Sequence, residues 1–227
     1  MIIYGKQLFL HVLEHYPAKL QTVFLSKKCD PKLFSRIAKV TSKICSIDER
    51  KAQALCHGGN HQGFIAEIEN IALTSFGDIK RGNFLVVLEE VTDVGNIGAI
   101  VRSAYAFGAD GLIISGVKSC NLEAILRTSS AAAFELPITV CSSTKDMLNE
   151  LKQIGFTLYG ADMGGEDVRN VAFASKKVLI MGSEGKGLSP KTKEKIDKII
   201  SINMQRAFDS LNVSAAAAVL CDRMANG

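Results

Sequence analysis

The sequence has no Trp and no CxxC motif, it has only four Pro, and aromatic residues make up 7% of its 227 residues. No apolar run approaches the roughly 18 residues needed to span a bilayer, which argues against a membrane partner. The six Cys are scattered and follow no recognisable signal peptide, so we expect a reducing, cytoplasmic location. With 47% hydrophobic and 22% charged residues, the composition is that of a globular protein and excludes disordered, collagenous and membrane classes.

The net charge of +4 is unevenly distributed. Residues 1–75 hold 10 Lys and Arg against 6 Asp and Glu, together with all four His, whereas residues 76–227 hold 17 charges of each sign. The positive surplus therefore belongs to the first third of the chain. A basic section attached to a neutral remainder indicates an acidic partner that is bound by that section.

The first section, residues 1–70, alternates between helical and extended patterns and predicts a small α/β domain. Pro17 stops the first expected helix, and Asp30-Pro31 supplies an N-cap and a first helical residue for the second. Helices are expected at 6–16, from 31 and at 48–55, and strands at 22–25, 43–47 and 64–68.

The second section, residues 84–227, follows a segment of mixed polarity at 71–83 that we expect to be a linker. It opens with an apolar run at 84–88, typical of a strand buried on both faces. Alternation of strands and helices predicts an α/β fold with a parallel sheet covered by helices on both faces, and such sheets bind ligands at the carboxyl ends of their strands. Further strands are expected at 111–115, 138–140, 157–161, 178–181 and 199–203, and helices at 97–107, 122–130, 144–154, 191–197 and 212–225.

Three segments that follow expected strands are candidates for chemistry, at 89–104, 181–188 and 202–214. In the middle one, Gly182, Gly185 and Gly187 allow positive φ and close backbone approach, as a nucleotide or adenosine pocket requires. The GxxGxG order fits neither the GxGxxG dinucleotide fingerprint nor a P-loop. Taken alone, a loop that merely turns tightly is the alternative.

The other two segments each have a local explanation and a functional one. Asn96 can cap the helix that follows it, and Asn212 or Ser214 can cap the last helix. Arg102 is either a surface arginine in a salt bridge or a guanidinium that binds a phosphate or a ribose near the pocket.

A metal site at His57 and His61 is disfavoured. Gly58 and Gly59 between them argue against a helix that would align the two rings, and no second ligand pair follows at zinc spacing.

Together the three segments resemble the signature motifs of the SpoU (TrmH) family of RNA ribose 2′-O-methyltransferases, in the SPOUT superfamily. NxGxxxRSA at 96–104, MGSEGxGL at 181–188 and SLNVSxAAA at 210–217 occur in the family's order and spacing. Gly5-Lys6, KAQA at 51–54 and HQG at 61–63 resemble, less specifically, the L30e-like substrate-binding domain of the subgroup that modifies large-subunit ribosomal RNA.

The resemblance implies transfer of a methyl group from S-adenosylmethionine to a ribose 2′-hydroxyl of structured RNA, with ribosomal RNA and guanosine favoured. It also implies a homodimer and a carboxy-terminal trefoil knot. The residues that match the family's donor-binding positions are Met181, Gly182, Gly187, Ile202, Met204 and Leu211. Those that match its catalytic set are Asn96, Arg102, Glu184, Ser210 and Asn212.

A ribose 2′-hydroxyl is a poor nucleophile until its proton is withdrawn. In the family, the arginine equivalent to Arg102 is proposed as the base and acts across the dimer interface. A guanidinium pKa above about 12 makes proton acceptance demanding, so electrostatic stabilisation of the developing alkoxide is an equal alternative. Asn96 and Glu184 would orient Arg102 or the ribose, and Ser210 and Asn212 would close the pocket.

The sequence departs from the family pattern near the donor loop. Asn203 and Arg206 stand where a Pro and a Gly are common, and Gly95 replaces the usual Pro of the first motif. With the altered third motif, a non-catalytic RNA-binding or ribosome-assembly factor that has lost donor binding is an alternative. Two others also stay open: a tRNA 2′-O-methyltransferase and an enzyme for another adenosine ligand. The cations expected to bind RNA phosphates are Lys27, Lys28, Lys32, Arg36, Lys39 and Lys43.

Overall fold

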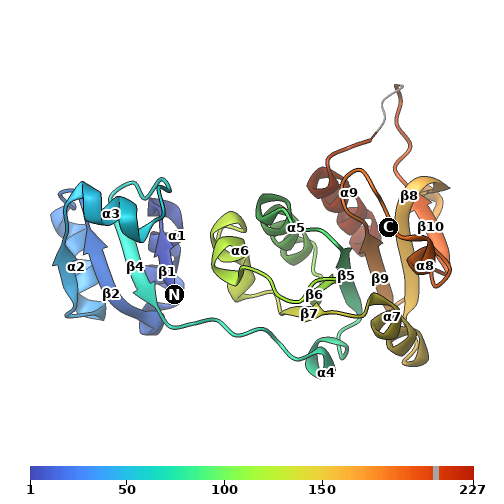
Figure 1. Cartoon of the computed structure of the whole chain (residues 1–227), viewed down its shortest axis with the longest axis horizontal. Coiled ribbons are helices and arrows are strands. Elements are labelled where there is room, and N and C mark those ends of the chain that lie inside the picture. Colours follow the sequence, from blue (N-terminus) through green and yellow to red (C-terminus); the bar gives the residue numbers. More distant parts are fainter. Residues whose placement is uncertain (207–209) are drawn as a thin grey trace. The chain divides into compact units, whose positions relative to one another are not determined.

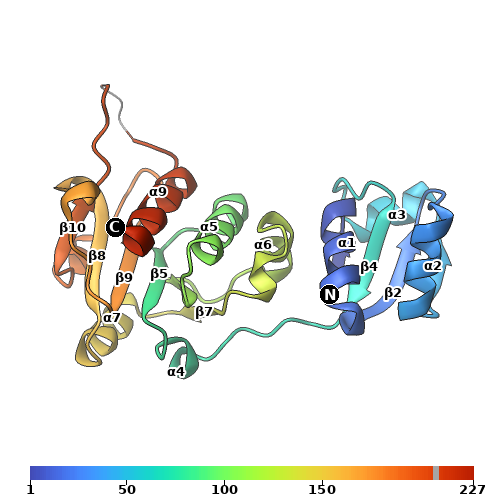
Figure 2. The ribbon, with the colours of Figure 1, turned by 180° about the vertical axis from the view of Figure 1, so that it is seen from behind.

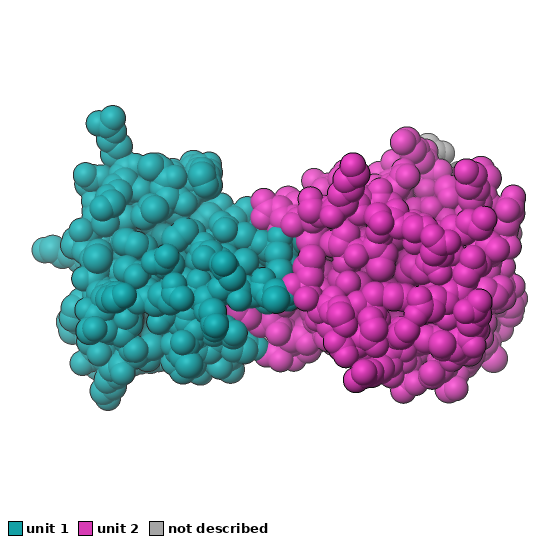
Figure 3. Space-filling view, turned by 60° about the horizontal axis from the view of Figure 1, so that its bottom comes forward, with its two compact units in different colours: residues 1–72, 122–131 teal, residues 73–121, 132–227 magenta. Residues whose placement is uncertain are grey.

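The computed structural model describes residues 1–206 and 210–227, which form two compact units. Unit 1 comprises Met1–Ala72 and Leu122–Ala131, and unit 2 comprises Leu73–Asn121 and Ala132–Gly227 (Figure 3). Among the described residues, no helix combines the length and the apolar character that a bilayer crossing would need.

Unit 1 is built on a mixed four-stranded sheet in the order β1-β4-β2-β3 (Figure 1). The central strand β4 is antiparallel to both β1 and β2, while β2 and β3 are parallel. Three of the strands were expected, whereas β1 is only three residues long, too short for a periodic pattern. The strands are β1 (Ile2–Tyr4), β2 (Leu20–Leu25), β3 (Ile44–Ser46) and β4 (Phe64–Ile68).

The helices of unit 1 begin where the sequence predicts. The Asp30 carboxylate accepts hydrogen bonds from the backbone N–H groups of Lys32 (3.0 Å) and Leu33 (3.1 Å), and Asp48 accepts one from Lys51 (2.7 Å). Both aspartates are thus N-caps, as expected. The helical elements are α1 (Lys6–His15), η1 (Pro17–Lys19), α2 (Pro31–Val40), α3 (Glu49–Leu55) and α6 (Leu122–Thr128).

Unit 2 contains a six-stranded sheet in the order β10-β8-β9-β5-β6-β7, with every pair of neighbours parallel (Figures 1 and 2). This confirms the predicted α/β fold class. All six strands coincide with expected apolar runs, although β8 extends six residues beyond its expected end at 161. The strands are β5 (Phe84–Glu89), β6 (Gly111–Ser115), β7 (Ile138–Cys141), β8 (Thr157–Asp167), β9 (Lys177–Met181) and β10 (Lys198–Ser201).

Helices cover both faces of this sheet. Leu85 and Val87 pack in one buried cluster with Leu148 and Leu151 of α7, and the alternate residues of β5 point to the opposite face, where α5 and α9 pack on each other. The segment expected to be a linker contains a short helix, α4, whose Ile79 is buried in the α7 cluster. The helical elements are α4 (Phe76–Ile79), α5 (Val94–Ala106), η2 (Ala132–Phe134), α7 (Thr144–Gln153), η3 (Val168–Asn170), α8 (Pro190–Lys193) and α9 (Val213–Asn226).

Candidate functional site

The three candidate segments leave the sheet at the carboxyl ends of β5, β9 and β10, of which β5 and β9 are neighbours. β9 lies between β5 and β8, with Leu88 opposite Met181 and Gly160 opposite Ile180. The chain runs from β5 outward to β6 and β7 and returns to β8 and β9 on the other side, so β5 and β9 form a topological switch point. Ligands of open α/β sheets bind at such a point.

The cap of α5 differs from the sequence expectation. We expected Asn96 to cap a helix starting at Ile97, but α5 begins at Val94 and its cap is Asp93, whose Oδ1 accepts a hydrogen bond from the backbone N–H of Asn96 (2.7 Å). An Asp three residues before a helical N–H makes an equally good cap. The side chain of Asn96, freed from the capping role, is available for other contacts.

One residue from each motif meets in a polar cluster of Asn96, Glu184 and Asn212. Asn96 Nδ2 donates to Glu184 Oε1 (3.1 Å), and Asn212 Nδ2 donates both to Glu184 Oε1 (2.8 Å) and to Asn96 Oδ1 (3.1 Å). Each side chain contacts the other two, so the cluster fixes the relative positions of all three segments. The two hydrogen bonds that the amide groups donate to the charged carboxylate are each stronger than a hydrogen bond between neutral groups.

Asn212 also begins α9. Its Oδ1 accepts hydrogen bonds from the backbone N–H of Ser214 (2.9 Å) and from Ser214 Oγ (2.6 Å), which makes Asn212 the N-cap. Of the two caps that the sequence allowed, Asn212 is therefore the correct one. The local and the site roles use opposite ends of one amide group.

The glycine loop after β9 turns tightly and lines a pocket at the same time. Gly185 and Gly187 adopt φ of 81° and 65°, and a Cβ on Gly182 would lie 2.1 Å from the carbonyl of Gly187. The loop closes through a hydrogen bond from the Gly187 N–H to the Ser183 carbonyl (2.9 Å). Glycine is thus required at 182 for close approach and at 185 and 187 for backbone conformation.

Glu89, which the sequence analysis did not single out, joins the end of the loop to β5 through hydrogen bonds. This carboxylate is only 6% exposed and accepts hydrogen bonds from the Ser189 N–H (3.0 Å), Ser189 Oγ (2.9 Å) and Thr192 Oγ1 (2.5 Å). The buried charge is therefore satisfied, and it fixes the end of the loop at the start of α8. The available signal was a carboxylate directly after the apolar run 84–88, at the last position of β5.

Beside the cluster lies a cavity of about 600 Å³, within the range of small-molecule sites. Glu184, Ser210 and Asn212 line it, whereas Asn96 reaches it only through its bonds to two of them. Three lining residues that the sequence gave no reason to select, Ala161, Asp162 and Met163, come from β8. All six candidate donor-binding residues also line it: Met181, Gly182, Gly187, Ile202, Met204 and Leu211.

Arg102 is not brought into the cluster. It is exposed on α5, and its side chain forms no hydrogen bond or ion pair with any residue that the structure describes. Arg102 follows Asn96 by six residues, which is about one and two-thirds turns of an α-helix. The two side chains therefore leave the helix on different sides. The salt bridge that would have explained Arg102 locally is therefore not seen within the described chain.

The six candidate RNA-binding cations of unit 1 are all exposed, and none forms an ion pair with a described residue. Lys32, Arg36 and Lys39 follow the i, i+4, i+7 spacing along α2 and share one face of it. Lys27, Lys28 and Lys43 lie just before and after that helix.

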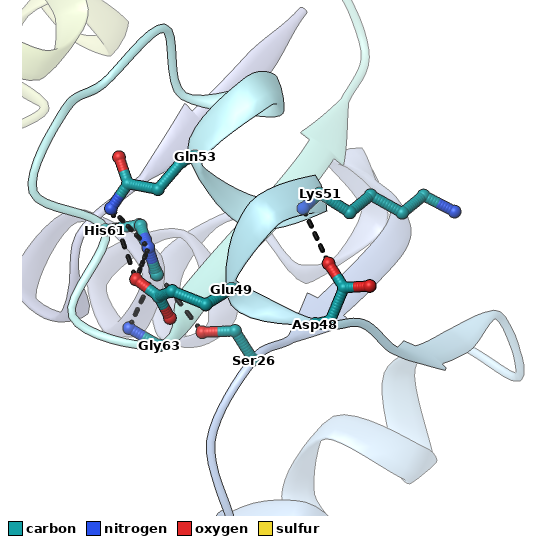
Figure 4. A network of polar contacts seen from close by, with 7 residues as sticks. All are labelled: Ser26, Asp48, Glu49, Lys51, Gln53, His61 and Gly63. Carbon is teal, nitrogen blue, oxygen red and sulfur yellow. Dashed lines mark hydrogen bonds and ion pairs between the residues drawn. The ribbon is translucent and has the colours of Figure 1, made fainter.

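His61 is buried in a hydrogen-bonded network (Figure 4). Its Nδ1 accepts from the Gly63 N–H (3.1 Å), which leaves Nε2 to donate to Glu49 Oε1 (3.0 Å). Gln53 Nε2 donates to the same Glu49 oxygen (3.2 Å), and this bond, with a smaller contribution from His61, lowers the pKa of Glu49. Among the described residues no group of three His, Cys, Asp or Glu is arranged to hold a metal ion.

Comparison with known proteins adds independent evidence. Residues 83–222 match the SpoU rRNA methylase family, and residues 2–72 match a family described as RNA 2′-O ribose methyltransferase substrate binding. An uncharacterized tRNA/rRNA methyltransferase of Borreliella burgdorferi is 31% identical over 87% of this chain and 94% of its own length. The 23S rRNA (guanosine-2′-O-)-methyltransferase RlmB of Pseudomonas putida is 29% identical over 96% of this chain and 92% of its own length.

Solved structures share the fold. An AdoMet-bound rRNA methyltransferase from Sinorhizobium meliloti superposes with a TM-score of 0.80 at 23% identity, over 98% of this chain and 85% of that one. The SpoU methyltransferase AviRb from Streptomyces viridochromogenes, in complex with AdoMet, gives a TM-score of 0.79 at 24% identity. The superposition covers 99% of this chain and 89% of that one.

Proposed function

This chain belongs to the SpoU rRNA methylase family and is an RNA methyltransferase, and from that premise we propose that it methylates a ribose 2′-hydroxyl of ribosomal RNA in the cytoplasm. The observation that carries the proposal is the Asn96–Glu184–Asn212 cluster, which joins all three motifs beside the cavity. Guanosine is the proposed nucleotide because the P. putida relative is named as a 23S rRNA (guanosine-2′-O-)-methyltransferase.

The cavity suits S-adenosylmethionine as the methyl donor. Its wall combines the tightly turned glycine backbone with apolar side chains such as Ile202 and Leu211, which suit an adenosine, and its volume of about 600 Å³ suits a ligand of that size. When bound, S-adenosylmethionine supplies a methyl group that is already activated on a sulfonium. The residues proposed to hold it are the six lining residues named above.

The chain's own residues then act on the ribose. Glu184, fixed by two amide donors, presents its carboxylate at the cavity and orients the ribose hydroxyl or a guanidinium beside it. Arg102 either accepts the 2′-proton or stabilises the developing alkoxide. Ser210 closes the cavity.

We propose that the protein is a homodimer in which Arg102 of the partner subunit completes each site. Support comes from the exposure of Arg102 on α5 and from its separation from Asn96 around that helix. A second copy could bring this guanidinium to the cavity that its own α5 does not serve. We also propose that the carboxy-terminal part of the chain forms the trefoil knot that the resemblance to the family implies.

We further propose that residues 1–70 bind RNA, that 71–83 connect the parts and that 84–227 carry out catalysis. The six exposed cations in and beside α2 support the first assignment, because clustered Lys and Arg, three of them on one face of this helix, are the electrostatic footprint of a protein that binds a phosphate backbone. A separate RNA-binding domain favours ribosomal RNA over tRNA.

The test has two parts. The full chain is titrated with S-adenosylmethionine by calorimetry, and ribose methylation is then mapped in ribosomal and transfer RNA from cells with and without the protein. We expect the donor to bind, and we expect cells without the protein to lack one ribosomal methyl group, which a gene carrying Arg102→Ala does not restore. No donor binding would favour a non-catalytic RNA-binding factor, donor binding without RNA methylation another adenosine-dependent enzyme, and a missing tRNA methyl group the tRNA alternative.

A further inference from the structure

Strand β8 contains an insertion where it pairs with β10. Ile199 pairs with Gly160, but the next residue, Ile200, pairs with Glu166. Residues 161–165 are therefore five extra residues between two paired stretches, which we call the 161–165 insertion. An insertion of this size re-aims side chains out of the sheet.

Two glycines shape the insertion. Gly164 has a φ of +78°, which makes the turn, and a Cβ on Gly165 would lie 2.7 Å from the Ile199 carbonyl carbon. Only glycine therefore lets the chain turn and return directly against the β10 backbone.

Both ends of the insertion are fixed. The Asp162 carboxylate forms an ion pair with Lys193 of α8, and the Gly165 carbonyl accepts a hydrogen bond from Ser201 Oγ (2.8 Å). Just beyond, Asp167 is paired with Arg169 (2.5 Å). The pKa of Asp167 is lowered to about 2, chiefly by the Arg169 hydrogen bonds and to a smaller extent by one from Asn203. Asn203, which departs from the family pattern, thus supports this segment.

Met163 at the tip of the insertion is left uncovered beside the cavity. It is 74% exposed, the highest value among the large hydrophobic residues that the structure describes. Gly160 lies opposite Ile180, so the insertion leaves the sheet level with the glycine loop, and Ala161, Asp162 and Met163 all line the cavity. Exposure alone would not single out one Met, but this apolar side chain is held by a braced segment in the wall of the cavity, where a bound ligand would cover it.

We propose that Met163 is a donor-binding residue, whose side chain covers S-adenosylmethionine in the cavity while the 161–165 insertion forms the wall that holds it there. The inference rests on the proposed function. Met163 has no charge with which to hold RNA phosphate, and it shares its cavity with the donor-binding candidates. Its unbranched thioether chain adapts to the shape of an adenosine or an amino-acid chain.

The test compares Met163→Ser and Met163→Leu with a matched control, Ile154→Ser, in the full-length protein. Ile154 is also an exposed apolar residue, at 36%, but it ends α7 and does not line the cavity. Calorimetry measures the Kd of S-adenosylmethionine and S-adenosylhomocysteine, and initial rates give the KM of donor and RNA. Thermal unfolding checks that each variant is folded.

We expect Met163→Ser to weaken binding of both ligands about five- to tenfold, from the lost burial of part of one Met side chain. The donor KM rises by the same factor and the RNA KM does not, while Met163→Leu stays close to wild type and Ile154→Ser matches it. Equal donor affinity in wild type and Met163→Ser, or a rise in the RNA KM alone, overturns this inference only. A wild-type protein that binds no donor overturns the proposed function as well.

Discussion

Asn212 Nδ2 lies 2.8 Å from Glu184 Oε1, while Asn212 Oδ1 accepts the Ser214 N–H at 2.9 Å, so one amide both begins α9 and holds the carboxylate beside the cavity. The two roles can be separated by substitution, because capping needs only a side-chain oxygen and the contact with Glu184 needs a donor.

We expect Asn212→Asp to keep the cap and to lose the contact, since a second carboxylate would repel Glu184. Methyl transfer should fall by at least tenfold while the free energy of unfolding stays near that of wild type. Asn212→Ala should lose the cap as well, at about 1 kcal/mol. Urea unfolding and single-turnover methylation measure the two effects; parallel losses of stability and activity in both variants would contradict this separation.

Arg102 offers a test of the proposed dimer. Arg102→Ala should abolish turnover and leave the Kd for the donor nearly unchanged, because Arg102 does not line the cavity. Asn212→Asp is impaired through its own site. If Arg102 serves the partner's site, mixing the two impaired variants gives heterodimers with one intact site, and activity should rise to about a quarter of wild type after random exchange. A mixture as inactive as its components would place Arg102 in its own protomer's site.

The cations of α2 should set the salt dependence of RNA affinity. We expect the double variant Lys32→Ala, Lys39→Ala to reduce the slope of log K against log salt by about 0.7–0.9 for each cation removed. The double variant Lys118→Ala, Lys145→Ala, which removes two exposed lysines of unit 2, serves as the control. Binding to a ribosomal RNA fragment is measured by fluorescence anisotropy over a range of salt concentrations. Equal slopes in the two variants would remove α2 from the RNA-binding surface.

Asp167 makes a prediction about acid stability. Its folded pKa of about 2 lies below the ordinary value of about 3.9, chiefly because Arg169 donates hydrogen bonds to the carboxylate. The unfolded state therefore binds the proton more readily, and the contribution of Asp167 is complete above about pH 5 and lost as the pH falls toward 2. The difference in unfolding free energy between wild type and Asp167→Asn should follow that course in urea titrations. A difference that is independent of pH would contradict it.

The sequence predicted those parts of the fold that depend on continuous local patterns. Apolar runs such as 84–88 located all six strands of unit 2, because a strand buried on both faces must be apolar throughout. Asp30 and Asp48 marked helix starts for the equally local reason that a cap bonds residues two or three positions away.

Features that depend on tertiary contacts were beyond such reasoning. The cap of α5 was misplaced because Asp93 and Asn96 are both capping residues and only packing selects between them. The β8 insertion is defined by its register with β10, and Met163 reaches the cavity only through it. The buried network of His61 likewise joins residues of α3 and of the loop before β4.

Glu89 provides the last prediction, because it links the glycine loop to β5 without lining the main cavity. Glu89→Ala leaves the Ser189 N–H and two hydroxyl donors without their buried acceptor, which should cost about 1–3 kcal/mol of stability. We also expect weaker donor binding, since the loop that carries Glu184 loses its attachment at Ser189.

Glu90→Gln is the matched control, because the neighbouring Glu90 is exposed. Glu89→Gln retains one acceptor oxygen but places an amide NH2 group, which is a donor, where the second carboxylate oxygen accepted. We therefore expect an intermediate effect. Urea unfolding gives the stability and calorimetry gives the donor Kd. A Glu89→Ala protein that is destabilised yet binds the donor like wild type would show that the glycine loop keeps its shape through Gly182 and Gly187 alone.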